Sequence, residues 1–311
     1  MASGRLVYQW TDHGFFSEMN YMLLAILYCR QHGREFVLSS RYAPVFHSAG
    51  WRDFFRPFCH ETDDRLLHFL DSRPLHAGQG LKARLSVLDK RVRRYMLTKL
   101  VQPLFYSDVT VVAQAWDALR ELRRQKEIVL PFEGVPRCCS LREALRLVNK
   151  EIWQYNDDTA AAIETSIAHL SLPVQYAALH VRRGDKTSES DSVGEITYIS
   201  QLERATALKA VYVATDDYRC VETVRRLRPG WQLWSLCPTE ARGYFPEDFD
   251  SQPPEERGRR TLLLLIETEI MTRAEVLVGT FSSGIGTYQG IVRSDRTYGV
   301  DYAEWIFEGG L

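Results

Sequence analysis

Short apolar runs alternate with amphipathic segments along much of the chain, and this alternation predicts the secondary structure. In the second half, almost uniformly apolar runs occupy residues 176–181, 210–215, 231–236 and 276–280. Segments with the apolar spacing of helices, such as 221–227 and 261–272, fall between most of these runs. Apolar strands that alternate with helices are typical of a parallel sheet covered on both faces. The second half is therefore predicted to be an α/β domain.

The first half begins with the same alternation. Residues 5–10 favour a strand, residues 18–31 a helix that ends before Gly33, and residues 35–39 a second strand. This order is the βαβ unit of a parallel sheet. Further along, the pattern predicts a helix at residues 81–100, a strand at 108–113 and another helix at 141–155. We expect two α/β domains, residues 1–172 and 173–311, with a ligand site beyond the carboxyl ends of the strands, in the cleft between the domains.

Composition and charge narrow the classes of partner. Thirty-nine basic and forty acidic residues leave a net charge of −1, which gives no electrostatic footprint for nucleic acid or an anionic membrane. The strongest early apolar run, residues 21–29, is too short to span a membrane and lacks the features of a signal peptide. The six cysteines show neither a C-x-x-C pair nor metal-ligand spacing, which favours buried thiols. We expect a soluble, cytoplasmic protein, or one of the Golgi lumen or secretory pathway if an N-terminal anchor has been removed.

The first candidate site is a basic segment, HVRRGDK, at residues 180–186, where the first apolar run of the second half ends. Arginine suits bidentate contacts to phosphate, and lysine suits a point-charge contact. Strand alternation places His180 and Arg182 on one side and Arg183 on the other, and Asp185 is expected to hold a guanidinium. A surface ion-pair cluster is the alternative, but the position at a strand's carboxyl end favours ligand binding.

Two further segments follow later strands. Asp216 and Asp217 come after residues 210–215. Paired acids at a strand end can have one of three roles: to bind a metal, to orient an arginine or to cap the next helix. Ser282, Ser283 and Gly284 lead into a helix, where backbone N–H groups and the helix dipole favour a phosphate, although such residues also cap helices. Together the three segments predict a diphosphate site.

The same three segments resemble, in order and spacing, the motifs of the α1,6-fucosyltransferase family: HVRRGDK at 180–186, VATDD at 213–217 and LVGTFSS at 277–283. The resemblance is specific over residues 175–290. It implies a GT-B-like fold, with two Rossmann-like domains facing a central cleft and the C-terminal one binding the donor. It also implies inverting transfer of fucose from GDP-fucose to a hydroxyl of a glycan acceptor, with no divalent metal or other cofactor.

Site residues carry over by position. The resemblance implies that His180 and Arg182 contact GDP, with Arg182 on the β-phosphate, and that Lys186 lies near the leaving diphosphate. Glu267 falls where the family has an aspartate that reads guanine. The remaining residues implied in the donor site are Arg183, Asp185, Asp216, Asp217, Ser282, Ser283, Gly284, and Gly14 and Asn20 of the first loop.

The sequence departs from the family at the general base. The family has a glutamate four residues after the motif's lysine, where this chain has Ser190. Acids flank that position, so we expect Glu189 or Asp191 to take the proton of the acceptor hydroxyl. The first loop, which starts at Gly14, has also lost most of the family's glycines.

Other functions remain open. A D-x-D sequence at residues 248–250 fits a metal-dependent GT-A enzyme, although its proline-rich, charged surroundings favour a solvated loop. Protein O-fucosyltransferases share a similar arginine signature. A pseudoenzyme that binds a GDP-sugar without transferring it is a third alternative, and another GDP-sugar such as GDP-mannose remains open as donor.

Overall fold

The computed structural model describes residues 4–65, 67, 92, 95–101, 104, 106–125, 127–132, 135–184, 193–293 and 295–307. The chain divides into two compact units. The first comprises residues 1–13 and 21–154, and the second comprises residues 14–20 and 155–311. Each unit contains one parallel sheet.

The first unit is built on a four-stranded sheet of order β3-β2-β1-β4. Its strands are β1 (Arg5–Gln9), β2 (Glu35–Ser39), β3 (His60–Glu61) and β4 (Val109–Val111), all parallel. Helix α1 (Phe15–Gln31) connects β1 to β2 and is almost entirely buried beyond its first turn. The predicted βαβ unit is therefore confirmed.

The other elements that the structure describes in the first unit are helices, helical turns and one hairpin. The elements are η1 (Gly50–Asp53), a π-helical turn η2 (Leu97–Val101), α5 (Val112–Arg124), β5 (Glu127–Phe132), β6 (Val135–Ser140) and α6 (Leu141–Ile152). Ser140 caps α6 by accepting a hydrogen bond from the backbone N–H of Glu143. The sequence did not predict α5 or the antiparallel β5–β6 hairpin.

The second unit alternates strands and helices in the order that the apolar runs predict. Its elements are α7 (Asp157–Leu170), β7 (Ala177–Val181), α8 (Glu195–Ala205), β8 (Ala210–Thr215), α9 (Tyr218–Leu227), β9 (Gln232–Trp234), α10 (Pro246–Asp250), α11 (Pro254–Arg273), β10 (Val276–Gly279), α12 (Gly284–Val292) and β11 (Thr297–Gly299). All four predicted strands are present. The D-x-D sequence at residues 248–250, whose surroundings favoured a solvated loop, instead lies in α10, and α11 begins shortly after it.

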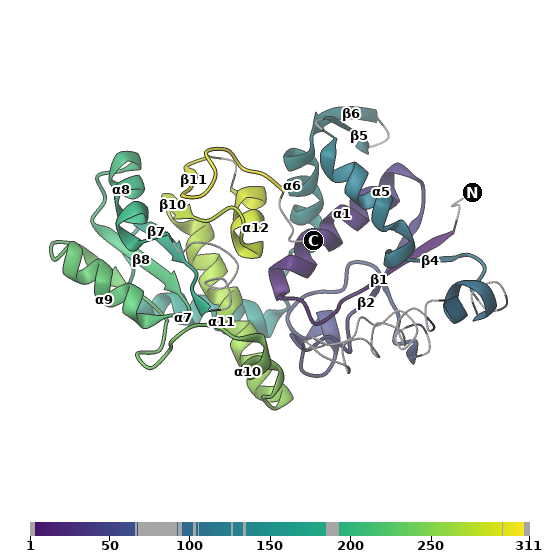
Figure 1. Ribbon diagram of the computed structural model, residues 1–311, viewed down its shortest axis with the longest axis horizontal. Coiled ribbons are helices and arrows are strands. Elements are labelled where there is room, and N and C mark those ends of the chain that lie inside the picture. Colours follow the sequence, from purple (N-terminus) through teal and green to yellow (C-terminus); the bar gives the residue numbers. More distant parts are fainter. Residues whose placement is uncertain are drawn as a thin grey trace. The chain divides into compact units, whose positions relative to one another are not determined.

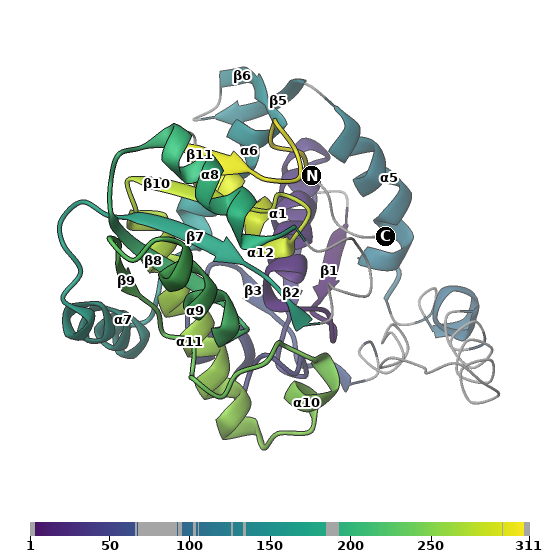
Figure 2. The same ribbon diagram turned by 60° about the vertical axis from the view of Figure 1, so that its left-hand side comes forward.

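The sheet of the second unit is doubly wound. Its strands are parallel and lie in the order β11-β10-β7-β8-β9, so the first strand is central and the chain winds outward in both directions. Figure 2 shows β7 between β10 and β8. The strand order reverses between β7 and β10, and ligands of such sheets bind beyond the carboxyl ends of the strands at that point.

Helices cover both faces of this sheet (Figure 1). Leu179, Val213 and Val278 point to the face covered by α8 and α9, where they form a buried cluster with Ile199 and Val224. The alternate strand positions face α11. There the hydroxyl of Tyr212 reaches Glu267, and β7 and β8 pack against the helix.

Helix α7 belongs to the second unit, whereas the sequence-based boundary at 172/173 placed it in the first. The reason is its packing against α11, where Arg273 forms an ion pair with Glu164. Nearby, the hydroxyl of Tyr155 donates to Glu269 at 2.9 Å.

Across the part of the chain that the structure describes, no helix combines the length and the apolar character needed to cross a bilayer.

Candidate functional site

The candidate site lies in the second unit, where the strand order reverses. Val278 of β10 pairs with Leu179 of β7, so Gly279 comes to lie beside His180. A Cβ on Gly279 would lie 3.3 Å from the Cβ of His180, so this glycine makes room for the imidazole. The first and third motifs are thereby brought together, as the sequence predicts.

His180 presents a neutral ring. It is 9% exposed, and burial together with the charge of Arg182 lowers its pKa to about 3. Its Nδ1 has no hydrogen-bond partner within the described parts of the chain. A cavity of about 10 Å³ borders the ring and is also lined by Gly279 and Gln289.

Arg182, the first residue after β7, lies against an aromatic ring. Its guanidinium carbon is 5.2 Å from the centre of the Tyr244 ring. This distance is that of a cation–π contact. Tyr244 comes from the segment that precedes α10, and the sequence analysis did not identify it.

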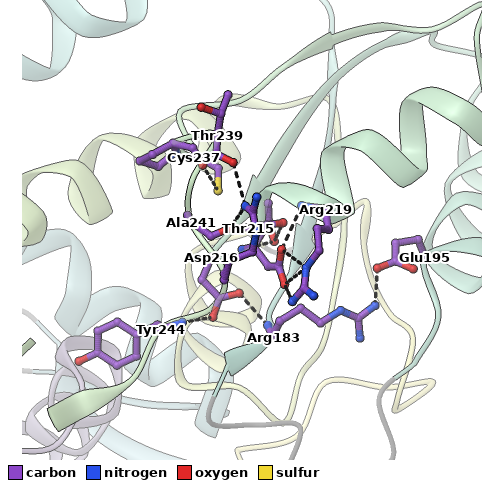
Figure 3. Close-up of polar contacts among 12 residues, drawn as sticks. Arg183, Glu195, Thr215, Asp216, Arg219, Cys237, Thr239, Ala241 and Tyr244 are labelled. Atoms are coloured by element: carbon purple, nitrogen blue, oxygen red, sulfur yellow. Dashed lines mark hydrogen bonds and ion pairs between the residues drawn. The ribbon is translucent and has the colours of Figure 1, made fainter. Parts of the chain in front are cut away.

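Arg183 points to the other side of the sheet. It donates to Glu195 at 2.6 Å, and both side chains are largely buried (Figure 3). Burial acts to raise the pKa of Glu195, but the hydrogen bond and charge of Arg183, a backbone hydrogen bond and the contact with Cys220 together outweigh burial, so the pKa is lowered. Beside this pair lies a pocket of about 400 Å³, lined by Arg183, Gly184, Glu195, Asp217, Arg219, Cys220, Thr223, Arg242 and Phe245. The two adjacent arginines therefore have different surroundings.

The paired acids after β8 have separate tasks. Asp216 accepts backbone hydrogen bonds from Arg183 at 2.7 Å and Tyr244 at 3.1 Å (Figure 3). Asp217 caps α9 by accepting from the N–H of Arg219 at 3.0 Å, and it also forms an ion pair with that arginine. Asp217 is therefore a helix cap, one of the roles that the sequence left open. Asp216 instead joins the loop after β7 to the segment before α10 through these two hydrogen bonds.

Glu267 lies on α11, facing β8. It accepts a hydrogen bond from the hydroxyl of Tyr212 at 3.1 Å, and its side chain is partly buried. Burial, with a smaller contribution from the charge of Asp216, raises its pKa to about 7. Near neutral pH this carboxyl is therefore part protonated and part ionised.

We expect this raised pKa to make stability depend on pH. A carboxyl whose pKa is higher in the folded state contributes stability fully below its ordinary pKa of 4.5, and that contribution is lost as the pH rises through about 7. The free energy of unfolding should fall by up to about 3 kcal/mol between pH 5 and pH 8 through this group. Urea unfolding of the wild type and of Glu267→Gln at both pH values measures the effect. An equal fall in both proteins would contradict the assignment.

The loop after β10 is closed by an acid that the sequence analysis missed. The carboxylate of Asp301 accepts hydrogen bonds from the N–H groups of Phe281 at 2.8 Å and Ser282 at 2.9 Å. These two amides are therefore bound within the protein. Ser283 caps α12 by accepting from the N–H of Gly286 at 3.0 Å. Asp301 follows β11 much as Asp216 follows β8, but the three residues of β11 give no sequence pattern that would have identified it.

The segment 14–20 packs against the start of α12. Nδ2 of Asn20 donates to the carbonyl of Gly284 at 2.8 Å. A Cβ on Gly284 would lie 3.0 Å from the backbone nitrogen of Ser17, so this glycine permits the close approach. Gly14 is exposed at the beginning of α1, and its carbonyl accepts from the N–H of Ser17 at 2.9 Å. Asn20 therefore supports the helix start of the third motif.

Four predicted site residues lie outside the described residues: Asp185, Lys186, Glu189 and Asp191. The D-x-D acids, Asp248 and Asp250, fall in the short helix α10. Among the residues that the structure describes, no group of three or more histidine, cysteine or acidic side chains is arranged to hold a metal ion.

No protein-family model matches this sequence, and no curated protein matches it significantly. Solved structures of fucosyltransferases do match its fold. The fucosyltransferase NodZ from Bradyrhizobium has a TM-score of 0.55 at 16% identity, over 92% of this chain and 92% of that chain. A mutant of Arabidopsis thaliana FUT1 in complex with GDP has a TM-score of 0.54 at 10% identity, over 95% of this chain and 70% of that one.

POFUT1 in complex with GDP-fucose is a third match, with a TM-score of 0.50 at 12% identity over 95% of both chains. A structure of NodZ α1,6-fucosyltransferase soaked with GDP-fucose also matches, with a TM-score of 0.55. The α/β, GT-B-like fold class is thereby confirmed.

Proposed function

We propose that this chain is a glycosyltransferase that transfers fucose from GDP-fucose to a hydroxyl of a glycan acceptor. The observation that carries the proposal is the position of Arg182 and of the α12 start. They flank the point where the order of a doubly wound sheet reverses. Structures with this fold bind GDP or GDP-fucose, which supports the choice of donor.

The proposed chemistry needs positive charge at the diphosphate. The acceptor oxygen forms a bond to the anomeric carbon while the bond from that carbon to the β-phosphate oxygen breaks, and the electron pair leaves with GDP. Negative charge grows on the diphosphate as that bond breaks, and fixed cationic donors stabilise it. In our proposal Arg182, Lys186 and the α12 helix start supply this stabilisation without a divalent metal.

The proton of the acceptor hydroxyl needs a base on the face opposite the leaving group, so that transfer inverts the anomeric configuration. We assign this role to Glu189 or Asp191. Glu195 is a poor candidate, because its ion pair with Arg183 lowers its pKa. Full transfer activity in a Glu189→Gln, Asp191→Asn double variant would exclude this assignment.

The guanine end of the donor is assigned to α11 and β7. An ionised Glu267 accepts hydrogen bonds from the N1–H and the amino group of guanine, which uridine does not offer in the same pattern. Neutral His180 offers a ring nitrogen without adding charge. The site should therefore discriminate guanine nucleotides from uridine nucleotides.

Calorimetric titration of the full chain with GDP, GDP-fucose, GDP-mannose and UDP-glucose tests the donor site. We expect GDP and GDP-fucose to bind equally well with and without EDTA, and UDP-glucose not to bind. Absence of binding by any guanine nucleotide would overturn the proposal. Binding that EDTA abolishes would overturn its metal-independent part.

A GDP-sugar-binding pseudoenzyme is the second candidate, and Ser190 at the family's base position favours it. A transfer assay with labelled GDP-fucose, offering both free glycans and folded glycoprotein domains, separates the candidates. Transfer to glycans supports our proposal, and transfer to a polypeptide hydroxyl supports a protein O-fucosyltransferase. GDP binding without transfer to either acceptor supports the pseudoenzyme.

A further inference from the structure

Two backbone segments touch beside the candidate donor site. Gly184, after β7, has φ of +60°, and Gly243, before α10, has φ of +114°. A Cβ on Gly243 would lie 2.7 Å from the Cα of Gly184, and a Cβ on Gly184 would overlap the backbone of Tyr244. Both positions therefore require glycine, for conformation and for space. Together they bring the backbone of Tyr244 against the end of the first motif.

Asp216 fixes this crossing with three hydrogen bonds. Its carboxylate accepts from the N–H of Arg183 on one segment and of Tyr244 on the other (Figure 3). Its carbonyl accepts from the N–H of Gly243 at 2.8 Å. An ionised acceptor makes the two carboxylate bonds strong. The place of Tyr244 is thus set by backbone contacts on both sides.

The ring of Tyr244 lies between a cation and a buried aromatic residue. The guanidinium carbon of Arg182 is 5.2 Å from the centre of the ring. The ring of Phe249, in α10, has its centre 6.0 Å away, and Phe249 is 6% exposed. A ring supported in this way is a fixed surface for the guanidinium.

We propose that Tyr244 is a positioning residue that holds Arg182 in the orientation in which it contacts the donor's β-phosphate. A ring face restrains the plane of a guanidinium without consuming its N–H donors, whereas a carboxylate partner would occupy two of them. The inference rests on the proposed function, since it takes the β-phosphate as the ligand of Arg182. The essential part of Tyr244 is its ring, so the hydroxyl is dispensable.

The test compares GDP with GMP, which lacks the β-phosphate. Metal-free calorimetry is carried out on the wild type, Tyr244→Phe and Tyr244→Leu. Tyr244→Phe should keep the GDP affinity within about twofold. Tyr244→Leu should weaken GDP binding about 3- to 30-fold, the range of a partly desolvated cation–π contact, while GMP binding changes by less than about twofold. In an Arg182→Ala background, Tyr244→Leu should have no further effect.

Phe245→Leu is the matched control, because Phe245 is 43% exposed and lines the pocket on the Arg183 side. It should leave the ratio of GDP to GMP affinity unchanged. If Tyr244→Leu does not fold, Tyr244→Met replaces the ring by a flexible chain of similar size and carries the same expectation. Thermal unfolding identifies folded variants.

Three results would overturn the inference. If Tyr244→Leu binds GDP with wild-type affinity while Arg182→Ala loses GDP binding, the proposed function stands but Tyr244 has no positioning role. Equal weakening of GDP and GMP assigns Tyr244 to general stability of the loop. A wild type that binds no GDP overturns the proposed function itself, and this inference with it.

Discussion

Arg182→Ala is expected to weaken GDP binding by at least about 100-fold, whereas Arg183→Ala is expected to change it by less than about threefold. The two arginines are adjacent just after β7, and their side chains take opposite sides. Arg182 lies beside His180 and Tyr244, at the point where the strand order reverses. Arg183 forms a largely buried ion pair with Glu195 (Figure 3).

The size of the first effect follows from the charge of the ligand. A hydrogen bond to a charged group contributes roughly 1.5–3 kcal/mol, and a bidentate contact to a diphosphate makes two. A loss of about 3 kcal/mol corresponds to a factor of about 150 in affinity. Arg183→Ala keeps the backbone N–H that donates to Asp216, so we expect GDP binding to change little. We expect the variant to be less stable, because Glu195 loses the arginine of its ion pair.

Calorimetry of GDP binding to both variants, with thermal unfolding as the test of folding, measures this difference. Equal loss of affinity in both variants would place Arg183 in the donor site too, as the resemblance to the fucosyltransferase motifs implies. Wild-type affinity in Arg182→Ala would mean that the diphosphate is bound elsewhere.

Arg293→Ala is expected to lower the free energy of unfolding by about 3–4 kcal/mol. The guanidinium lies at the carboxyl end of α11, where it donates to the carbonyls of Met271 at 3.0 Å, Thr272 at 2.6 Å and Ala274 at 2.7 Å. Its Nε also donates to Thr297 of β11 at 2.9 Å. Helix-end carbonyls need partners, and a cation is favoured by the negative end of the helix dipole.

The expected loss in the free energy of unfolding is large because Arg293 is half-buried and connects the end of α11 to β11. Burial lowers its pKa, but arginine stays protonated at neutral pH, so all its hydrogen bonds remain charge-assisted. Removing the side chain leaves several carbonyls with poor access to water, which costs about 1–3 kcal/mol for each group left unsatisfied. Arg293→Lys should lose less, because it keeps the charge but provides a single donor group.

Chemical denaturation of Arg293→Ala and Arg293→Lys measures these costs. Arg259→Ala is the matched control, since Arg259 is an exposed arginine on α11, the helix whose end Arg293 contacts. Arg259 pairs with Glu256, and such surface pairs contribute little. A loss in Arg293→Ala no larger than that in Arg259→Ala would contradict the proposed role at the helix end.

The second unit was predictable because its inner strands β7, β8 and β10 are buried on both faces. The runs 176–181, 210–215, 231–236 and 276–280 are almost uniformly apolar, and each contains a strand of the sheet. Parallel strands also align their carboxyl ends, so residues after three separate runs could be placed at one edge. The α/β class followed from these patterns, whereas the GT-B-like arrangement followed from the resemblance to the fucosyltransferase motifs.

Elements with weaker local patterns were missed. The β5–β6 hairpin contains Pro131 and Pro136, which the pairing places opposite each other, and proline argues against a strand in sequence. Strand β11 has only three residues, too few for an alternation to be recognised. Helix α10 lies in a segment of prolines and charges, where only Phe249 is buried.

Candidate site residues could be named from the sequence where a strand end or a motif marked them, and their roles stay predictions. His180, Arg182 and Asp216 were named in this way. Tyr244 and Asp301 were not, because their contacts join segments distant in sequence: Tyr244 is 62 positions after Arg182 (244 − 182), and Asp301 is 19 positions after Ser282. The separate tasks of Asp216 and Asp217 also depend on tertiary contacts, since the dipeptide alone fits either role.

Asp301 and the residues around it have a consequence for shortening the chain from its carboxyl end. Strand β11 pairs with β10 at the edge of the sheet, and Trp305 donates to the carbonyl of Thr287 in α12 at 2.9 Å. A protein that stops before β11 would lose the acid that closes the loop after β10 and would expose β10 as a new sheet edge, to which other chains can pair. Removing these last residues would therefore favour aggregation as well as disturb the candidate site, so a purification tag is better placed at the amino end.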